Sequence, residues 1–176
     1  MGMKGDSAKS ERRSIRLRGW DYTNPSAYFV TICTYRRANT FDEPRFREIA
    51  ENAWRHIPNQ PHAKHAFLHE WILMPNHVHG IIVLDERDEV SADSALSEGT
   101  KPGSIPSIVG NYKSLVTRRI NNLRRKPGGK VWQRGYYERI IRNEREYDAI
   151  RAYIRANPDR WGEDPDNLDS LINPQL

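Results

Sequence analysis

Four segments of the chain carry the hydrophobic pattern of β-strands. They are residues 28–35, 65–74, 77–84 and 131–141. The first is β-branched and aromatic almost throughout, which is typical of a buried strand. Between the second and third segments, Pro75 and Asn76 favour a tight turn, so these two segments are expected to form an antiparallel hairpin.

Three further segments have apolar residues at three- and four-residue spacing, which is the period of an amphipathic α-helix. They cover residues 46–57, 104–123 and 144–157. Ser104 or Ser107 can cap the start of the second helix, and Asn143 can cap the third. Pro58 and Pro158 end the first and third helices, because the residue before a proline is disfavoured in helical conformation.

The order of these elements predicts the fold class. Strand, helix, two strands, helix and strand, in that order, is the plan of the ferredoxin-like split βαβ fold, an α+β architecture. Right-handed crossovers place the first two helices on one face of a four-stranded antiparallel sheet. The last helix is an addition at the C-terminus. Many unrelated functions share this fold, so the fold alone does not identify a function.

The chain is predicted to form one domain with flanking segments. Residues 1–18 are basic and polar and are expected to form a flexible arm, and residues 19–160 hold all the predicted elements. Within that domain, residues 85–103 are acidic, rich in Ser, Gly and Ala, and without periodicity, which indicates a mobile surface loop. Residues 161–176 are an acidic tail.

The composition excludes several classes of protein. The 176 residues are 37% apolar and 29% charged, which is polar but not the composition of a disordered chain. No apolar run is long enough to cross a membrane, and the N-terminus has no signal-peptide segment. A single cysteine, Cys33, excludes an intramolecular disulfide and a cysteine-rich zinc site. We therefore expect a soluble, cytoplasmic protein without a membrane partner.

The net charge of +5 is distributed unevenly along the chain. Residues 104–160 hold fourteen Lys and Arg against five Asp and Glu, a net charge of +9, and six aromatic residues lie among them. Residues 85–98 carry a net charge of −5. Solvated helices alone would explain part of this, but basic and aromatic residues in one third of the chain favour a nucleic-acid surface.

Two histidines open the third predicted strand. Side chains two apart on a strand share a face, about 7 Å apart along it, so His77 and His79 could bind one metal ion. A pair of this kind is more often solvated or hydrogen-bonded for structural reasons. Here the strand is apolar enough to be central, and a buried imidazole needs a partner, which favours the metal-binding interpretation.

Two tyrosines on predicted helices differ in their angular position relative to the apolar stripe of the helix. At about 100° per residue, Tyr112 falls at the centre of its helix's apolar stripe and is predicted to be core. Tyr153 is predicted to lie at the edge of its own stripe with its ring partly exposed, on the same side as Asn157 one turn later. The alternative interpretation makes Tyr153 an interfacial aromatic and Asn157 a C-terminal cap.

Several motifs together resemble a known family. They are Met74-Pro-Asn-His-Val-His-Gly80, Trp132-Gln133, Ile141-Arg-Asn143, Tyr153-Ile-Arg-Ala-Asn-Pro158 and the N-terminal Arg16-Leu-Arg-Gly-Trp-Asp-Tyr22. In their order along the chain, these motifs resemble the HUH single-tyrosine transposases, and in particular the REP-associated tyrosine transposases. The resemblance covers roughly residues 16–161, so it would make residues 19–160 the catalytic domain.

The resemblance implies a role for each matching residue. His77 and His79 correspond to the histidines that hold a divalent metal, Tyr153 to the nucleophile, and Asn157 to the side chain that completes the metal site. Imidazole and amide ligands with open positions suit Mg²⁺ or Mn²⁺. The family cleaves single-stranded DNA beside a hairpin, forms a covalent 5′-phosphotyrosine and rejoins strands, and it includes dimers; this chain is expected to be a monomer or a homodimer.

Basic side chains on two helices, and one just before the second of these helices, are candidate DNA contacts. They are Lys113, Arg118, Arg119, Arg142, Arg151 and Arg155. Two alternatives to a DNA-nicking strand transferase remain. One is a DNA-binding regulator of the same fold whose cleavage activity is lost or unused. The other is a metal-dependent phosphodiesterase that uses water, which the lack of an acidic cluster beside the histidines disfavours.

Overall fold

The computed structural model describes residues 20–86 and 100–160. The predicted N-terminal arm at 1–18, most of the predicted loop at 85–103 and the predicted tail at 161–176 lie outside these residues. Within the described part of the chain, no helix combines the length and the apolar character needed to cross a membrane.

The structure confirms the predicted fold class. The strands are β1 (Ser26–Cys33), β2 (Ala66–Leu73), β3 (His77–Leu84) and β4 (Tyr137–Ile141). They form one sheet in the order β2-β3-β1-β4, and every neighbouring pair is antiparallel. The strand that begins with the two histidines is therefore internal, as the sequence predicts.

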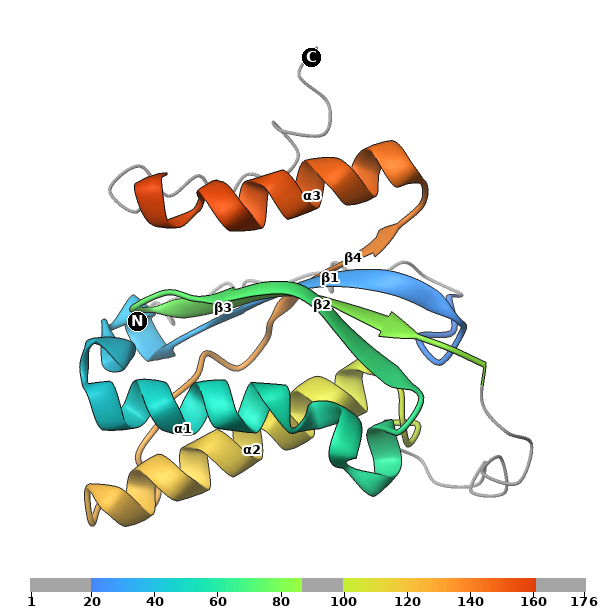
Figure 1. The fold of residues 1–176 in the computed structure, drawn as a ribbon. Coiled ribbons are helices and arrows are strands. Elements are labelled where there is room, and N and C mark those ends of the chain that lie inside the picture. The colour runs from blue at the N-terminus through green and yellow to red at the C-terminus, as the bar shows by residue number, and fades with distance from the viewer. Residues whose placement is uncertain (1–19, 87–99, 161–176) are drawn as a thin grey trace, which may run out of the picture.

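The helices lie on both faces of this sheet. They are α1 (Pro44–Arg55), α2 (Ile105–Leu123) and α3 (Glu144–Ala156). Helices α1 and α2 cover one face and α3 covers the other (Figure 1). Two of the predicted caps are present: the Ser104 hydroxyl accepts from the Ser107 N–H, and the Asn143 side chain accepts from the Glu146 N–H.

The alternation of side chains on the strands divides the core in two. Val78 and Ile82 of β3 point toward α1 and α2 and join the larger cluster. Ile81 points the other way and packs with Ile150 and Ile154 of α3. Side chains at odd-numbered positions of β3, which include both histidines, therefore face α3.

Gly80 follows the two histidines because the strand passes very close to α1. A Cβ atom at this position would lie 2.3 Å from Cζ2 of Trp54, a buried side chain of α1. No real Cβ atom tolerates that distance, so the position requires glycine for lack of space rather than for backbone freedom. The missing side chain leaves room for the Trp54 ring.

The fourth predicted strand is shorter than the sequence pattern indicates. Only Tyr137–Ile141 pair with β1, and Trp132 makes a single bridge to Thr34. Between these points the Lys113 ammonium group donates to the backbone carbonyls of Gln133, Arg134 and Gly135 at 2.7–3.3 Å. Because these carbonyls bond to a side chain of α2 instead of a neighbouring strand, residues 133–135 form a loop.

Candidate active site between the sheet and helix α3

The two histidines lie together in the interior on the α3 side of the sheet. His77 is 0% exposed and His79 is 1% exposed, and their ring centroids are 4.4 Å apart. They share a face of β3, as predicted, and their side chains lean toward one another, which brings the rings closer than the spacing along the strand.

His79 is held on both ring nitrogens. Its Nδ1 lies 2.8 Å from the Thr31 hydroxyl and its Nε2 lies 3.2 Å from the Tyr153 hydroxyl. In the tautomer protonated on Nδ1, that N–H donates to Thr31 and the Nε2 lone pair accepts from the tyrosine. The ring also stacks on Phe29, with centroids 5.5 Å apart, so its orientation is fixed by three neighbours.

His77 is oriented by the residue before it. Its Nδ1 lies 2.6 Å from the Asn76 side-chain oxygen. A carboxamide oxygen can only accept, so Nδ1 carries the proton and the lone pair is on Nε2. Fixing the tautomer through the remote nitrogen is how proteins prepare an imidazole to bind a metal.

Burial keeps His79 neutral. Removal from water lowers the pKa of His79 well below the usual value of 6.5, and the charges of His77 and Arg37 lower it further. Arg37 belongs to a turn in which two consecutive non-glycine residues, Arg36 and Arg37, have φ angles of 56° and 53°. A neutral imidazole retains the lone pair that metal binding or proton acceptance requires.

Tyr153 is more buried than its sequence position suggests. It is 7% exposed and packs edge-on against Phe29, with ring centroids 6.3 Å apart. The prediction of a partly exposed residue at the helix edge is wrong, because α3 lies flat on the sheet and covers the flank of its own apolar stripe. The same packing brings the phenol to His79, with ring centroids 5.1 Å apart.

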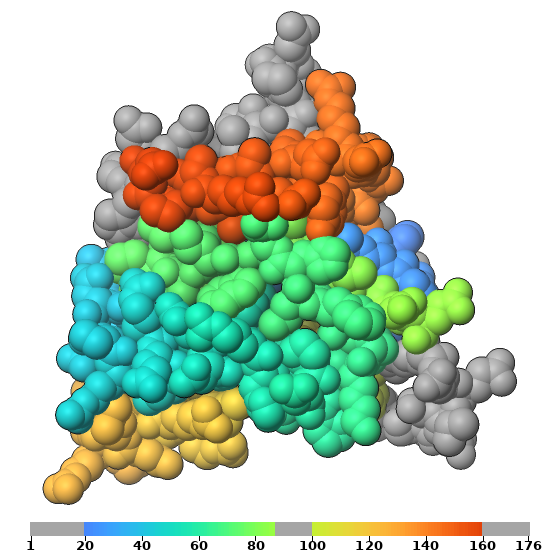
Figure 2. Space-filling model, viewed as in Figure 1, coloured from blue at the N-terminus to red at the C-terminus, as the bar shows by residue number. Residues whose placement is uncertain are grey.

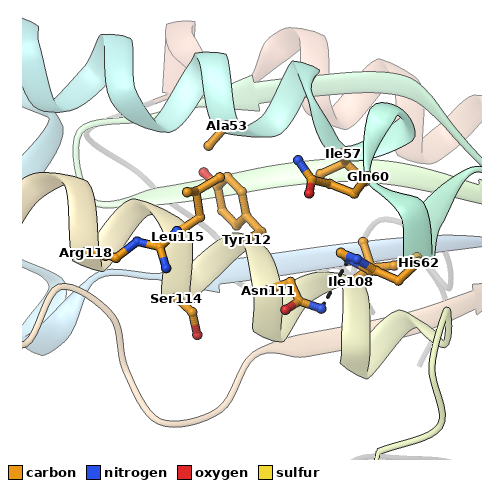
Figure 3. A pocket seen from close by; sticks show the side chains of 10 residues that line it. All are labelled: Ala53, Ile57, Gln60, His62, Ile108, Asn111, Tyr112, Ser114, Leu115 and Arg118. Carbon is orange, nitrogen blue, oxygen red and sulfur yellow. Dashed lines mark hydrogen bonds between the residues drawn. The ribbon is translucent and has the colours of Figure 1, made fainter.

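Tyr112 is a core residue, as predicted. It is 3% exposed and packs against Trp54, with ring centroids 5.2 Å apart. Its ring forms part of a pocket between α1 and α2, on the opposite side of the sheet from the histidines (Figure 3). At the rim of this pocket the Asn111 amide lies 3.1 Å from His62 Nε2.

The donor atoms near the histidines fit a divalent metal only if an amide completes the set. Asn157 is 3% exposed and is the C-cap of α3, one turn beyond Tyr153. Among residues 20–86 and 100–160, no three His, Cys, Asp or Glu side chains are grouped so as to hold a metal ion. The binding of a metal by His77, His79 and the Asn157 carboxamide stays a prediction from the motifs.

The sheet separates the predicted DNA contacts into two groups. Lys113, Arg118 and Arg119 belong to α2, whereas Arg151 and Arg155 belong to α3 on the other face (Figure 1). Arg142 lies between β4 and α3 and belongs to neither helix.

Within each group, several cations already have protein partners. Lys113 is the residue that holds the 133–135 loop, and burial lowers its pKa. Arg151 and Arg155 both donate to Glu70 of β2, at 3.1 and 2.6 Å. Arg118, Arg119 and Arg142 are exposed.

Two residues of this site were missed by sequence reasoning. Thr31 and Phe29 contact His79, yet they lie 48 and 50 positions away in the chain. Thr31 is directly opposite His79 in the register of β1 and β3. Their spacing of two on a predicted strand signals a shared face, but only the strand pairing shows that this face carries the histidines.

Comparison with known proteins supports the fold and places the chain in a family. No family model matches the sequence. The chain is similar to a solved REP-associated tyrosine transposase bound to a REP hairpin, with a TM-score of 0.57, 21% identity and coverage of 84% of this chain and 75% of that one. It is also 33% identical to an uncharacterized protein of Haemophilus influenzae, over 93% of this chain and 97% of the relative.

The solved structure shows the fold of this chain, and the curated relative shows its family. The architecture, a split βαβ sheet with an additional C-terminal helix, is the fold of the REP-associated tyrosine transposase, as the motifs predict. The chain belongs to one family with the Haemophilus influenzae protein.

Proposed function

We propose that this protein cleaves and rejoins single-stranded DNA beside a hairpin, as in DNA transposition, through a covalent bond between Tyr153 and a 5′ phosphate. The observation that carries the proposal is the 3.2 Å contact between the Tyr153 hydroxyl and Nε2 of His79. The solved REP-associated tyrosine transposase, whose fold this chain shares, is bound to a REP hairpin, which supports DNA of this form as the partner.

In the proposed reaction, the Tyr153 hydroxyl gives its proton to solvent water and its oxygen forms a bond to phosphorus. The bond between phosphorus and the 3′ oxygen of the preceding nucleotide breaks, and that oxygen takes up a proton from water to become a free 3′ hydroxyl. The phosphotyrosine retains the energy of the broken diester, so a 3′ hydroxyl can later displace the tyrosine and rejoin a strand. Hydrolysis by water would lose that energy.

The chain's own residues prepare this step. Thr31 and Phe29 fix the ring of His79, and Asn76 fixes the tautomer of His77. We infer that Nε2 of each histidine and the Asn157 carboxamide would hold Mg²⁺ or Mn²⁺, and that a metal on Nε2 of His79 would take the place of the hydrogen bond from the Tyr153 hydroxyl. When bound, such an ion would neutralise charge on the scissile phosphate and orient it.

The test is a covalent adduct. The protein is incubated with a labelled single-stranded DNA hairpin carrying unpaired flanks, with Mn²⁺, and the products are run on a denaturing gel. A protein-linked band that mass spectrometry maps to Tyr153 supports the proposal. Binding without cleavage supports the regulator alternative, and free DNA ends without an adduct support the hydrolytic alternative.

Histidine variants separate the metal site from DNA binding. We expect His77→Ala and His79→Ala to abolish Mn²⁺-dependent cleavage but to bind the hairpin nearly as tightly as the parent protein, because phosphate contacts supply most of the affinity. The exposed His56→Ala variant is the matched control and should cleave normally. Full cleavage by either site variant at ordinary metal concentration would contradict the proposed metal site.

A further inference from the structure

An open groove runs along the outer edge of the sheet. It lies on the β2 side, and its lining includes Arg47, Arg55, Trp71, Met74, Pro75 and Pro158. Strand β2 is an edge strand, and in Figure 2 the green residues of this part of the chain form a band between α3 and α1. The groove therefore joins the two helical layers around the edge of the sheet.

One end of the groove reaches the candidate active site. Met74 and Pro75 immediately precede the Asn76-His77 pair, and Pro158 immediately follows Asn157. His77, His79 and Tyr153 are themselves buried. A long substrate bound at that site would continue into this groove.

Two clusters that each contain two arginines and a glutamate flank the groove. On the α1 side, Glu51 accepts from Arg55 at 3.1 Å and forms a longer ion pair of 3.8 Å with Arg47, which donates to the backbone carbonyls of Phe41 and Leu73. On the α3 side, Glu70 accepts from Arg151 at 3.1 Å and from Arg155 at 2.6 Å.

The α1 cluster carries two positive charges and one negative charge, whereas in the α3 cluster Arg151 also pairs with Asp148 at 3.5 Å, so that two positive charges meet two negative ones. A guanidinium group has five N–H donors, so pairing with one carboxylate leaves donors for a second acceptor. The net positive charge of the α1 side, together with guanidinium groups on both sides of the groove, suits a polyanion.

Between the two clusters is a surface on which a planar group can stack. The Arg55 guanidinium lies over the Trp71 ring, 5.2 Å from its centroid. The Arg55 side chain is 56% exposed, so the face of the guanidinium that is turned away from Trp71 is open to solvent. Unpaired bases stack on aromatic rings and on guanidinium planes alike.

We propose that this groove binds the unpaired nucleotides that flank the DNA hairpin, with one base stacked on Arg55 and its phosphates held by the flanking arginines. The identity of the strand rests on the proposed function, whereas the groove's charge and stacking surface do not. The phosphates of a DNA strand can pair with the guanidinium groups of the groove, and its bases can stack on the flat surface. A purely acidic peptide has no group that would use the stacking surface.

The experiment measures binding without cleavage. Affinities are determined in EDTA by fluorescence anisotropy for two labelled hairpins, one with single-stranded flanks and one blunt. We expect Arg55→Ala to weaken binding of the flanked hairpin about tenfold, the size of one lost base stack, and to leave the blunt hairpin within twofold. Arg45→Ala removes the same charge from an exposed position of α1 outside the groove, and it should change neither.

A cross-linking experiment gives a second, independent measurement. Bromodeoxyuridine in the flank is irradiated, and the adduct is mapped by mass spectrometry. A cross-link to Trp71 supports the groove, and a cross-link confined to α2 would overturn it. Equal losses for Arg55→Ala and Arg45→Ala, or displacement of the flanked hairpin by polyglutamate at equal charge concentration, would also overturn it.

Failure of the groove and failure of the proposed function give different results. If an adduct forms on Tyr153 while Arg55→Ala retains the full preference for flanked DNA, the groove is wrong and the chemistry stands. If Arg55→Ala loses that preference and no adduct forms with Mn²⁺, the groove stands and the chemistry is wrong.

Discussion

At the scale of single residues, the site depends on which contacts each polar group makes inside the protein. His79 has a hydrogen-bonding neighbour on each nitrogen and an aromatic ring on one face. Tyr112 is equally buried, yet its hydroxyl has no hydrogen-bond partner among the described residues. Burial raises the pKa of Tyr112 far above the usual tyrosine value, so it stays protonated. A group in that position is suited to packing and not to nucleophilic attack.

Substitution of the two tyrosines by phenylalanine should have opposite effects on stability. Tyr153→Phe removes the hydroxyl that contacts His79 Nε2, so we expect a loss of about 1 kcal/mol in the free energy of unfolding. Tyr112→Phe removes a buried hydroxyl without a partner, so we expect no loss and a gain of up to about 1 kcal/mol. Urea unfolding measures both.

The same two variants test the nucleophile. Tyr153→Phe should form no covalent DNA adduct, whereas Tyr112→Phe should form it at the parent rate. An adduct mapped to Tyr112, Tyr136 or Tyr137 would show that the active site has been assigned to the wrong tyrosine.

The lowered pKa of His79 predicts acid sensitivity of the metal-free protein. Below about pH 6.5 the unfolded chain takes up a proton on this imidazole, while the folded state resists it, so stability is lost as the pH falls below that value. Above that pH the residue contributes no pH dependence. Thermal unfolding in EDTA at pH 7 and pH 5 measures the effect.

Variants assign this acid sensitivity to the residue. His79→Gln should lose less stability than the parent protein between pH 7 and pH 5. Burial also lowers the pKa of His62, so part of the loss should remain in that variant. His56→Gln, at an exposed position, is the control and should behave as the parent. An unchanged slope in His79→Gln would contradict the assignment.

At the scale of elements, β3 packs against α3 on one face of the sheet and against α1 and α2 on the other. Its odd-numbered residues build the site under α3, and Gly80 lets it pass close to Trp54 of α1. Helix α3 is held over the site by its apolar contacts with the sheet and by the two arginines that bind Glu70 of β2. The position of Tyr153 therefore depends on how both faces of the sheet are packed.

Two glycine-to-alanine variants should change stability in opposite directions. Gly80→Ala places a Cβ atom 2.3 Å from Trp54, and we expect a loss of about 1–3 kcal/mol from overpacking of the core. Gly110→Ala lies in α2 with no atom within 4 Å of the added Cβ, and the helix propensity of alanine predicts a gain of about 0.5–1 kcal/mol. Thermal unfolding measures both; a neutral Gly80→Ala would show that the sheet and α1 can move apart at little cost.

At the scale of the whole molecule, the sheet divides the basic surface. The net charge of +9 on residues 104–160 is contiguous in the sequence, but α2 and α3 carry it to opposite faces (Figure 1). A bound DNA can use only the part that faces it. The candidate site and the edge groove both lie on the β2 and α3 sides of the molecule. Arg151 and Arg155 of α3 are therefore expected to contact the DNA.

Salt dependence tests this division. We expect the hairpin with unpaired flanks to bind more tightly than a blunt duplex of equal length, and to weaken steeply with salt. Exchanging both Arg151 and Arg155 for alanine should lower the slope of log affinity against log salt by about one to two. The same exchange at Arg118 and Arg119 should leave that slope unchanged. Equal reductions for both pairs would show that the DNA contacts both faces.

The strands and helices and their order can be predicted from the amino-acid sequence alone, because periodicity, caps and prolines act over a few neighbouring residues. It predicted the hairpin, the cap at Asn143, a cap at Ser104 or Ser107, the internal position of the histidine strand and the burial of Tyr112. The family resemblance of its motifs also selected His77, His79, Tyr153 and Asn157 as the residues to examine. The caps and the burial of Tyr112 follow from spacing within one segment.

Only the tertiary structure decided the features that depend on contacts between distant segments. The pairing of β1 with β3 brings Thr31 and Phe29 to His79, and the docking of α3 buries Tyr153 against it. The Lys113 ammonium, on α2, shortens the last strand by binding its carbonyls. The sheet then separates charges that are adjacent in the sequence. Spacing along the chain cannot specify such contacts, because they arise only when the helices pack on the sheet and bury side chains that each layer alone would leave exposed to solvent.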